Sequence, residues 1–301
     1  MSKLAVAMVV VALVIAACTG SGDSEVTTSS TTTPAPVTTL PPASTTTSTV
    51  AVSETTTTTI AVPTNDCVVA ADVSVEGYEK ACTVLDIVLR SDEEVDDNAF
   101  AAQSDRIYNM LITRPDLTEA VASGAEGRII GADQRITTLP EFTELYELFP
   151  GIDWDRRERA YPGSSEVPYF AGAEENLLCS DDDRNEGEDM FVRVFGLTIR
   201  RFGLDVVDPS TSTAIDQAYG RAIAAGLWEN TLAEINSDEY WMEGVQSYFD
   251  ANLENNDEDR APNSSHNHVN TRDELRTYDP ALFSVAESVF TDGTWRPTCP
   301  T

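Results

Sequence analysis

A single charged side chain, Arg193, interrupts an otherwise apolar stretch in the middle of the chain, MFVRVFGLTI (190–199). Acidic residues precede this stretch, and two arginines and Gly203 follow it, which is the charge and cap pattern of an α-helix. A helix over about residues 186–202 that is apolar on nearly every side is expected to be central and buried. Burying a guanidinium is costly unless an acceptor pairs with it, so the sequence predicts a partner for Arg193 on another element.

Two further groups of residues carry side chains that could do chemistry. Glu239 and Glu243 lie one turn apart in SDEYWMEGVQSYFDAN (237–252), a predicted helix. The only histidines, His266 and His268, form an H-x-H pair in a polar loop. This pair has two interpretations: a relocated metal site that uses nearby carboxylates, or an exposed loop with a structural role. A G-x-S-x-G nucleophile motif and a Gly-rich phosphate loop are both absent from the sequence.

The composition is strongly acidic. The 301 residues include 51 Asp and Glu against 19 Lys and Arg, which gives a formal net charge of −32. Nucleic-acid binding needs a positive surface, so this class of function is disfavoured. Such acidity could attract cationic partners or hard cations, but a solvated acidic surface is the favoured interpretation.

The N-terminus has the pattern of an export signal. Residues 1–17 carry Lys3 as their only charge, and the sequence Ile15-Ala16-Ala17-Cys18 resembles the lipobox of bacterial lipoproteins. It predicts a signal peptide over 1–17, a lipid on Cys18 and a domain held on the extracytoplasmic side of the cell membrane. The alternatives are an ordinary secretory signal and an uncleaved helix, for which the apolar run is short.

Composition divides the rest of the chain in two. Residues 18–65 are rich in Thr, Ser and Pro and lack a periodic apolar pattern, which predicts a disordered tether. Residues 66–301 have the length and composition of one folded domain. This domain contains four cysteines without a C-x-x-C pair, so two disulfides are favoured over a zinc ribbon, with three connectivities open. The cysteines are Cys67, Cys82, Cys179 and Cys299.

Apolar periodicity and turn residues predict an α+β domain with early strands and late helices. Strands are expected at 85–91 and 127–133, with an irregular stretch over 150–173 and an edge strand over 173–178. Helices are expected at 96–114, 116–123, 141–149, 213–226 and 237–252. Ser237 or Asp238 is the expected N-cap of the last of these, and Thr271 with Glu274 fits a capping box.

Two segments resemble a known family: GEDMFVRVFGLTI, and some forty residues later DEYWMEGVQSYFD. They are similar to zinc metallopeptidases related to the lethal-factor type of gluzincin, whose central helix reads GE-x-[IL]-[FL]-V-H-E-F-A-H-T-I. In that family two histidines bind zinc, the glutamate between them activates water, and a later helix supplies a glutamate as third ligand. AEENLLC, AYGRAIAAGLW and HNHVNTRDEL also resemble it, so the likeness covers most of residues 75–296. It implies a zincin-like domain with a small mixed sheet, a buried central helix and a helical C-terminal half.

The residues that bind zinc and activate water in this family are replaced in this chain. Arg193 stands at the first histidine, Val194 at the glutamate and Leu197 at the second histidine; only Glu239 remains, with Glu243 one turn beyond. One carboxylate does not hold catalytic zinc and valine accepts no proton, so neither zinc nor peptidase activity is expected. The resemblance implies that Arg193 reaches Glu239, including through a bidentate contact. The alternative is that Arg193 extends to the edge of a solvent-filled cleft.

These observations favour a surface-anchored lipoprotein whose domain is catalytically inactive and binds a peptide or protein partner in its cleft. The edge strand expected near 174–178 could accept an extended chain by β-addition. An alternative is an active metal-dependent hydrolase that uses Glu239, Glu243 and the His266/His268 loop. A scaffold without any ligand in the cleft is a third hypothesis.

Overall fold

The structure, a computed structural model, describes residues 64–71, 74–157, 159–253, 255, 261–291 and 293–300. The signal peptide expected at 1–17, the lipid attachment at Cys18 and nearly all of the tether expected at 18–65 lie outside these residues. None of the helices in the described part of the chain has the length and apolar character that crossing a membrane requires.

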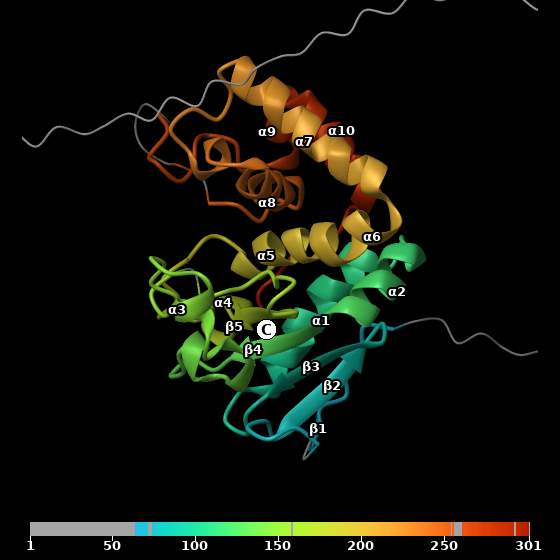
Figure 1. Ribbon diagram of the computed structural model, residues 1–301, viewed down its shortest axis with the longest axis vertical. Helices are drawn as coiled ribbons and strands as arrows, with labels where there is room; N and C mark the ends of the chain where they lie inside the picture. The colour runs from blue at the N-terminus through green and yellow to red at the C-terminus, as the bar shows by residue number, and fades with distance from the viewer. Residues whose placement is uncertain are drawn as a thin grey trace, which may run out of the picture. The chain divides into compact units, whose positions relative to one another are not determined.

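A five-stranded mixed sheet in the order β1-β2-β3-β4-β5 forms one side of the fold, at the bottom of Figure 1. β1, β2 and β3 are antiparallel, whereas β4 lies parallel to both β3 and β5. A tight turn at Leu85 and Asp86, both with positive φ, joins β2 to β3. The strands are β1 Ala70–Ala71, β2 Lys80–Val84, β3 Ile87–Ser91, β4 Glu126–Ile130 and β5 Tyr169–Ala173.

Helices α1, α2 and α3 lie between strands of the sheet in the sequence, and α4 directly follows β5. Asp96 caps α1 by accepting a hydrogen bond from the Asn98 amide, and Pro115 is the first residue of α2, where its missing amide costs nothing. Short 3₁₀ turns at Ile136–Thr138 and Pro140–Phe142 precede α3. The helices are α1 Asp97–Leu111, α2 Pro115–Gly124, α3 Leu145–Leu148 and α4 Glu174–Leu177.

The central helix, α5 (Met190–Thr198), lies between the sheet side of the fold and the C-terminal helices (Figure 1). Every residue of α5 is buried, as the apolar sequence predicts. Asp189 caps it by accepting from the Val192 amide, so the helix begins later than the expected residue 186. At the other end the backbone continues as a π-helix (Ile199–Leu204) and then as α6 (Asp205–Val207), so Gly203 does not end it.

The C-terminal half is helical, with side-chain caps at the start of each long helix. Asn236, and not the expected Ser237 or Asp238, caps α8, and the expected capping box of Thr271 and Glu274 is present at α9. Asp208 and Asp279 cap helices that begin with proline. These helices are α7 Pro209–Ala224, α8 Ser237–Tyr248, α9 Arg272–Tyr278 and α10 Pro280–Phe290, with a 3₁₀ turn at Leu232–Glu234.

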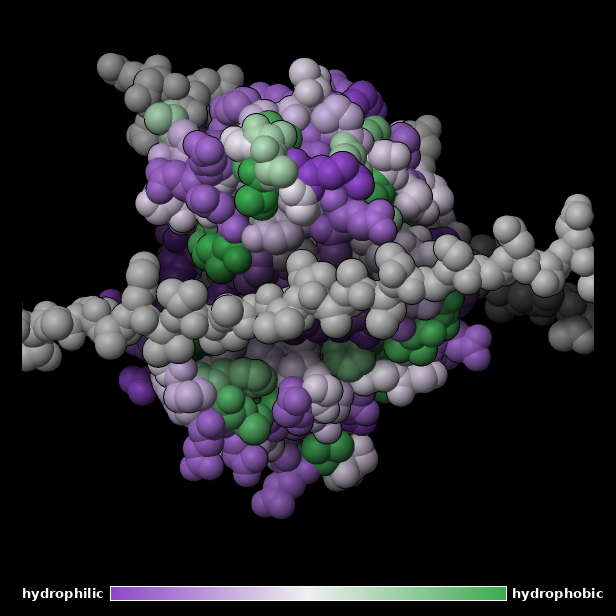
Figure 2. All heavy atoms as spheres, turned by 45° about the horizontal axis from the view of Figure 1, so that its top comes forward, coloured by the Kyte–Doolittle hydropathy of each residue, from purple (hydrophilic) through white to green (hydrophobic). Residues whose placement is uncertain are grey.

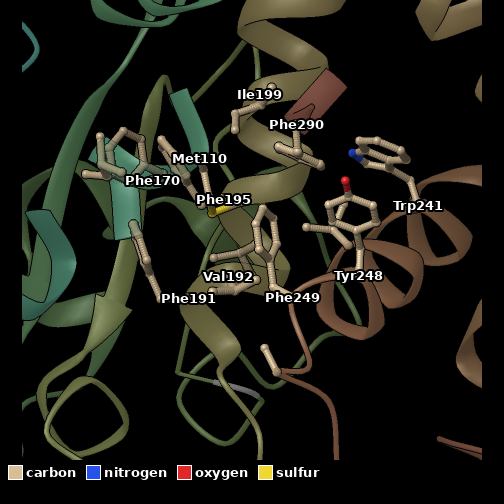
Figure 3. Packing of buried hydrophobic residues seen from close by; sticks show 14 of the residues in the cluster. Met110, Phe170, Phe191, Val192, Phe195, Ile199, Trp241, Tyr248, Phe249 and Phe290 are labelled. Carbon is tan, nitrogen blue, oxygen red and sulfur yellow. The ribbon is translucent and has the colours of Figure 1, made fainter. Parts of the chain in front are cut away.

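Aromatic side chains pack on both sides of α5. Phe191 and Phe195 of α5 lie against Phe170 of β5, with ring centroids 6.0 and 5.1 Å from it. On the other side, the rings of Trp241 and Tyr248 of α8 pack against the ring of Phe290, the last residue of α10 (Figure 3). The arrangement joins the sheet and the C-terminal helices into one hydrophobic core.

Two disulfides join distant parts of the chain, which settles the connectivity that the sequence left open. Cys67 pairs with Cys82, with a Cα–Cα distance of 5.3 Å, and fastens the start of the domain to β2. Cys179 pairs with Cys299, with a Cα–Cα distance of 5.6 Å and a sequence separation of 120 residues. This second bridge fastens the C-terminal segment beside the loop that leads into α5.

Two sequence-based expectations about the sheet are wrong. The segment 173–178, expected to be an edge strand, contains helix α4; the true edge strand, β5, lies at the end of the stretch expected to be irregular. Four of the five β5 residues are buried, so the strand lacks the alternation of apolar and polar residues that identifies a half-exposed strand. β2 was not predicted either. The strand expected at 85–91 combines the turn residues Leu85 and Asp86 with β3, so the sequence did not indicate a hairpin there.

Candidate functional site

A cleft of about 600 Å³ lies beside α5. Its walls come from α5 and the π-helix that follows, from the start of α8 and from the segment between α3 and β5. Val194 and Leu197 of α5 both line the cleft. The other lining residues are Phe149, Trp154, Arg157, Ala160, Tyr161, Pro162, Ser164, Ser165, Glu166, Arg201, Phe202, Asp205, Asn236, Asp238, Glu239 and Met242.

Arg193 is fully buried behind this cleft and pairs with carboxylates of α8. Its side chain is 1% exposed, and its Nη2 lies 2.5 Å from Oε2 of Glu239. Its Nη1 donates to Oε2 of Glu243 at 2.8 Å and to Oε1 of Gln246 at 3.0 Å. The predicted pairing with Glu239 is therefore confirmed. The expectation of a bidentate contact with Glu239 is wrong, however, because Nη2 of the guanidinium binds Glu239 and Nη1 binds Glu243.

Close packing between α5 and α8 brings these charges together. A Cβ at Gly196 would lie 2.8 Å from a methyl group of Val245, so only glycine permits this approach. The indole of Trp241 donates to the Gly196 carbonyl at 2.8 Å, which fixes the register of the two helices. Glu239 and Glu243 then face Arg193 from successive turns of α8.

A second layer of polar groups surrounds Glu243. His266 Nδ1 lies 2.8 Å from Glu243 Oε1, and Asn252 donates to the same oxygen at 2.8 Å. Burial alone would raise the pKa of Glu243, but the hydrogen bond from His266 and the charge of Arg193 outweigh it and lower that pKa. Burial likewise opposes protonation of His266, yet Glu243 and then Glu188 raise its pKa above the ordinary value. The Glu243 carboxyl group therefore lies between the Arg193 guanidinium and the His266 imidazole, and both lower its pKa.

The histidine pair does not converge on one site. His266 is 6% exposed and its Nε2 lies 3.6 Å from Glu188, so the interpretation of an exposed loop is wrong for this residue. His268 points elsewhere and packs edge-on against Tyr278, with ring centroids 5.3 Å apart. His266 thus belongs to the polar layer behind Glu243, whereas His268 belongs to the packing of α9.

The side chains between α5 and α8 do not fit a zinc ion. Glu239 and Glu243 are both bound to the Arg193 guanidinium, and Val194 and Leu197 offer no donor atom. Within the described residues, no group of three or more His, Cys, Asp and Glu side chains has a geometry that could hold a metal. A cationic guanidinium at this place also repels a divalent cation.

The front wall of the cleft, between α3 and β5, was not predicted from the sequence. Arg159, in the left-handed conformation (φ 51°), anchors this wall by pairing with Glu175. Arg157 reaches across the opening to Glu239 Oε1 at 3.0 Å. Arginines in a charged, irregular segment gave no sign of these roles.

The backbone of the front wall extends the sheet. Tyr161 exchanges two hydrogen bonds with Ala171 of β5, at 3.0 and 2.8 Å, in an antiparallel bridge. The Thr198 hydroxyl donates to the Pro162 carbonyl at 2.8 Å, which ties the same segment to the end of α5. The outer edge of β5 is therefore partly covered by the chain itself, and the expected β-addition at 174–178 has no strand on which to occur.

Three exposed apolar side chains are sequence neighbours of residues that line the cleft. Among the described residues the exposed large hydrophobic side chains include Leu148, Val206 and Ile235. Leu148 directly precedes Phe149, Val206 follows Asp205 and Ile235 precedes Asn236, and each of these neighbours lines the cleft. On the face shown in Figure 2, hydrophobic residues form small separate patches among hydrophilic ones.

Comparisons with protein families, with curated proteins and with solved structures give no match for this chain.

Proposed function

We propose that residues 66–301 form a non-catalytic binding module whose cleft holds a peptide segment of a partner protein. The observation that carries this proposal is the position of Arg193, which occupies the space between Glu239 and Glu243 with both of its Nη atoms engaged. The charges of Arg193, Glu239 and Glu243 are thus already paired with one another. Val194 and Leu197 give the cleft an apolar surface and supply no group that could act as a general base. Such a site offers contact area but no activated water.

Descent from a zinc metallopeptidase of the gluzincin type is part of the same proposal. Arg193, at the first-histidine position, lies in contact with Glu239, at the third-ligand position, as it would if the family's two helices were retained. The mixed sheet, buried central helix and helical C-terminal half agree with that descent. An organic cation would then have replaced the metal as the link between α5 and α8.

The anchoring of the module is proposed from the sequence alone. The lipobox-like sequence ending at Cys18 and the Thr/Ser/Pro-rich residues that follow favour a lipid anchor and a spacer. The two disulfides of the folded domain are typical of proteins that fold in an oxidising compartment outside the cytoplasm. The partner would then be met on the outer side of the cell membrane.

A rim substitution tests whether the cleft binds peptides. Wild-type protein is screened by fluorescence polarisation against a library of capped peptides, and the best peptide is then measured with Ile235→Lys and Val68→Lys. Ile235 is 63% exposed and directly precedes Asn236, which lines the cleft, whereas Val68 is 80% exposed and has no lining residue beside it in the sequence. Ile235→Lys is expected to weaken binding about 3- to 10-fold, because it removes one apolar contact. Equal affinity in all three proteins would argue that the peptide binds elsewhere.

A further inference from the structure

The disulfide between Cys179 and Cys299 lies at the surface, whereas the disulfide between Cys67 and Cys82 lies against the core. Cys179 and Cys299 are both exposed, and both line a second cavity, of about 400 Å³, beside the start of α5. Cys82 is 5% exposed and belongs to the hydrophobic core, and Cys67 packs against the same core. A thiol reaches an exposed disulfide in the folded protein, but it reaches a buried one only after local opening.

Residues 297–300 depend on the Cys179–Cys299 disulfide for their position. Apart from it, these residues make no hydrogen bond or ion pair within the described part of the chain. Pro297, Thr298 and Cys299 nevertheless form one side of the second cavity. If the disulfide is broken, this side of the cavity keeps only its peptide bond to Arg296.

The residues directly before this segment have attachments besides the disulfide. Trp295 donates from Nε1 to Asp105 Oδ2 at 3.0 Å, and its ring packs against the hydrophobic core. Arg296 pairs with Asp250. Loss of the disulfide is therefore expected to release residues 297–300 while Trp295 and Arg296 keep their contacts.

We propose that the Cys179–Cys299 disulfide is a redox-sensitive crosslink, which a dithiol reduces in the folded protein, and that its reduction releases residues 297–300 and opens the second cavity. A thiolate of the dithiol attacks one of the two cysteine sulfurs and forms a mixed disulfide, while the Sγ–Sγ bond breaks and the other cysteine leaves and takes up a proton. The second thiol of the reductant then displaces the first cysteine, so the dithiol loses two electrons and the protein gains two thiols. This device is independent of peptide binding in the cleft.

Carboxylates beside the disulfide influence which reductant reaches it. Asp181, Asp183 and Glu186 line the same cavity, and none of the three forms an ion pair with a described residue. Their negative charge repels a reductant that carries further negative charge, such as glutathione. A dithiol protein with a neutral or basic surface around its thiols is therefore the favoured partner, and uncharged dithiothreitol is the matching small-molecule probe.

Graded reduction of the purified protein tests whether the crosslink is accessible in the folded state. Samples treated with increasing dithiothreitol are blocked with iodoacetamide, and peptide mass spectrometry measures the alkylation of each cysteine. Cys179 and Cys299 are expected to react at least about tenfold faster than Cys67 and Cys82, while near-UV circular dichroism keeps its folded signal. The buried disulfide of the same molecule is the control. Equal rates for the two disulfides, or reduction of Cys179–Cys299 only as the folded signal is lost, would overturn the proposal.

Backbone ¹⁵N relaxation tests whether reduction releases the segment. The amides of Thr298 and Cys299 are expected to become mobile on reduction, with order parameters below about 0.6, whereas the amide of Trp295 stays rigid. A double serine variant of Cys179 and Cys299 is expected to show the same mobility at both positions without reductant, which separates loss of the disulfide from other effects of dithiothreitol. Order parameters at Thr298 and Cys299 that stay unchanged after reduction would overturn the release.

Discussion

Replacing Arg193 with methionine is expected to lower the free energy of unfolding by about 3–5 kcal/mol. The methionine fills most of the volume, so the loss arises from two carboxylates, Glu239 and Glu243, that remain buried without their shared cation. Arg157 still reaches Glu239, and His266 still reaches Glu243, which keeps the loss within that range. Urea unfolding followed by tryptophan fluorescence measures the change.

Two further variants identify the cause of this loss. Arg276→Met removes an exposed arginine whose partner is Asp273, and it is expected to change stability by less than about 1 kcal/mol. Adding Glu239→Gln and Glu243→Gln to Arg193→Met is expected to recover part of the stability, because the buried negative charges are then gone. If the triple variant were less stable than Arg193→Met alone, unpaired charge would not be the cause.

Removing the Cys179–Cys299 disulfide by a double serine substitution is expected to lower the free energy of unfolding by about 2–5 kcal/mol. The two cysteines are 120 residues apart, so the bridge restricts the unfolded chain over much of the domain. In the folded protein the bridge also holds the segment in which Trp295 packs against Phe249, with ring centroids 5.4 Å apart. Urea unfolding of the purified variant gives the value.

The other disulfide is the matched control. Cys67 and Cys82 are only 15 residues apart, so their double serine variant is expected to lose less stability than the Cys179/Cys299 variant. The opposite order would show that the longer bridge contributes little beyond the contacts around it.

Local signals in the sequence predicted the long helices well. The apolar run around Arg193 identified the buried central helix, and the Thr271–Glu274 pattern identified a capping box that is present. Both signals depend on neighbouring residues alone, which is why sequence suffices to find them. Element ends were less accurate: Asn236 caps α8, although Ser237 and Asp238 are equally good capping residues by type.

Features that depend on tertiary contact were missed. β5 is buried on both faces, because Phe191 packs over Gly172 while Ala171 belongs to a cluster with Phe142 and Tyr161, so its sequence shows no alternation. The π-helix at Ile199–Leu204 has the composition of an ordinary helix. Phe202 of this π-helix packs against Gly163 in the front wall of the cleft. This is a contact between distant segments, which local sequence does not reveal.

The candidate site was predictable only in part. The spacing of two helices in a known family indicated that Arg193 and Glu239 would meet, and they do. The H-x-H pair had singled out His266, although as a candidate metal ligand, whereas the structure places it in a hydrogen bond with Glu243. Gln246 and the front wall of the cleft are brought to the site by folding, and nothing in their local sequence marks them.

The central claim, that the Arg193 guanidinium has taken the place of a metal, is tested most directly by X-ray diffraction from crystals grown with zinc chloride. The anomalous difference map at the zinc absorption edge is expected to show no peak between α5 and α8, with Arg193 density spanning Glu239 and Glu243. A zinc peak on Glu239, with Arg193 displaced from both carboxylates, would contradict the claim.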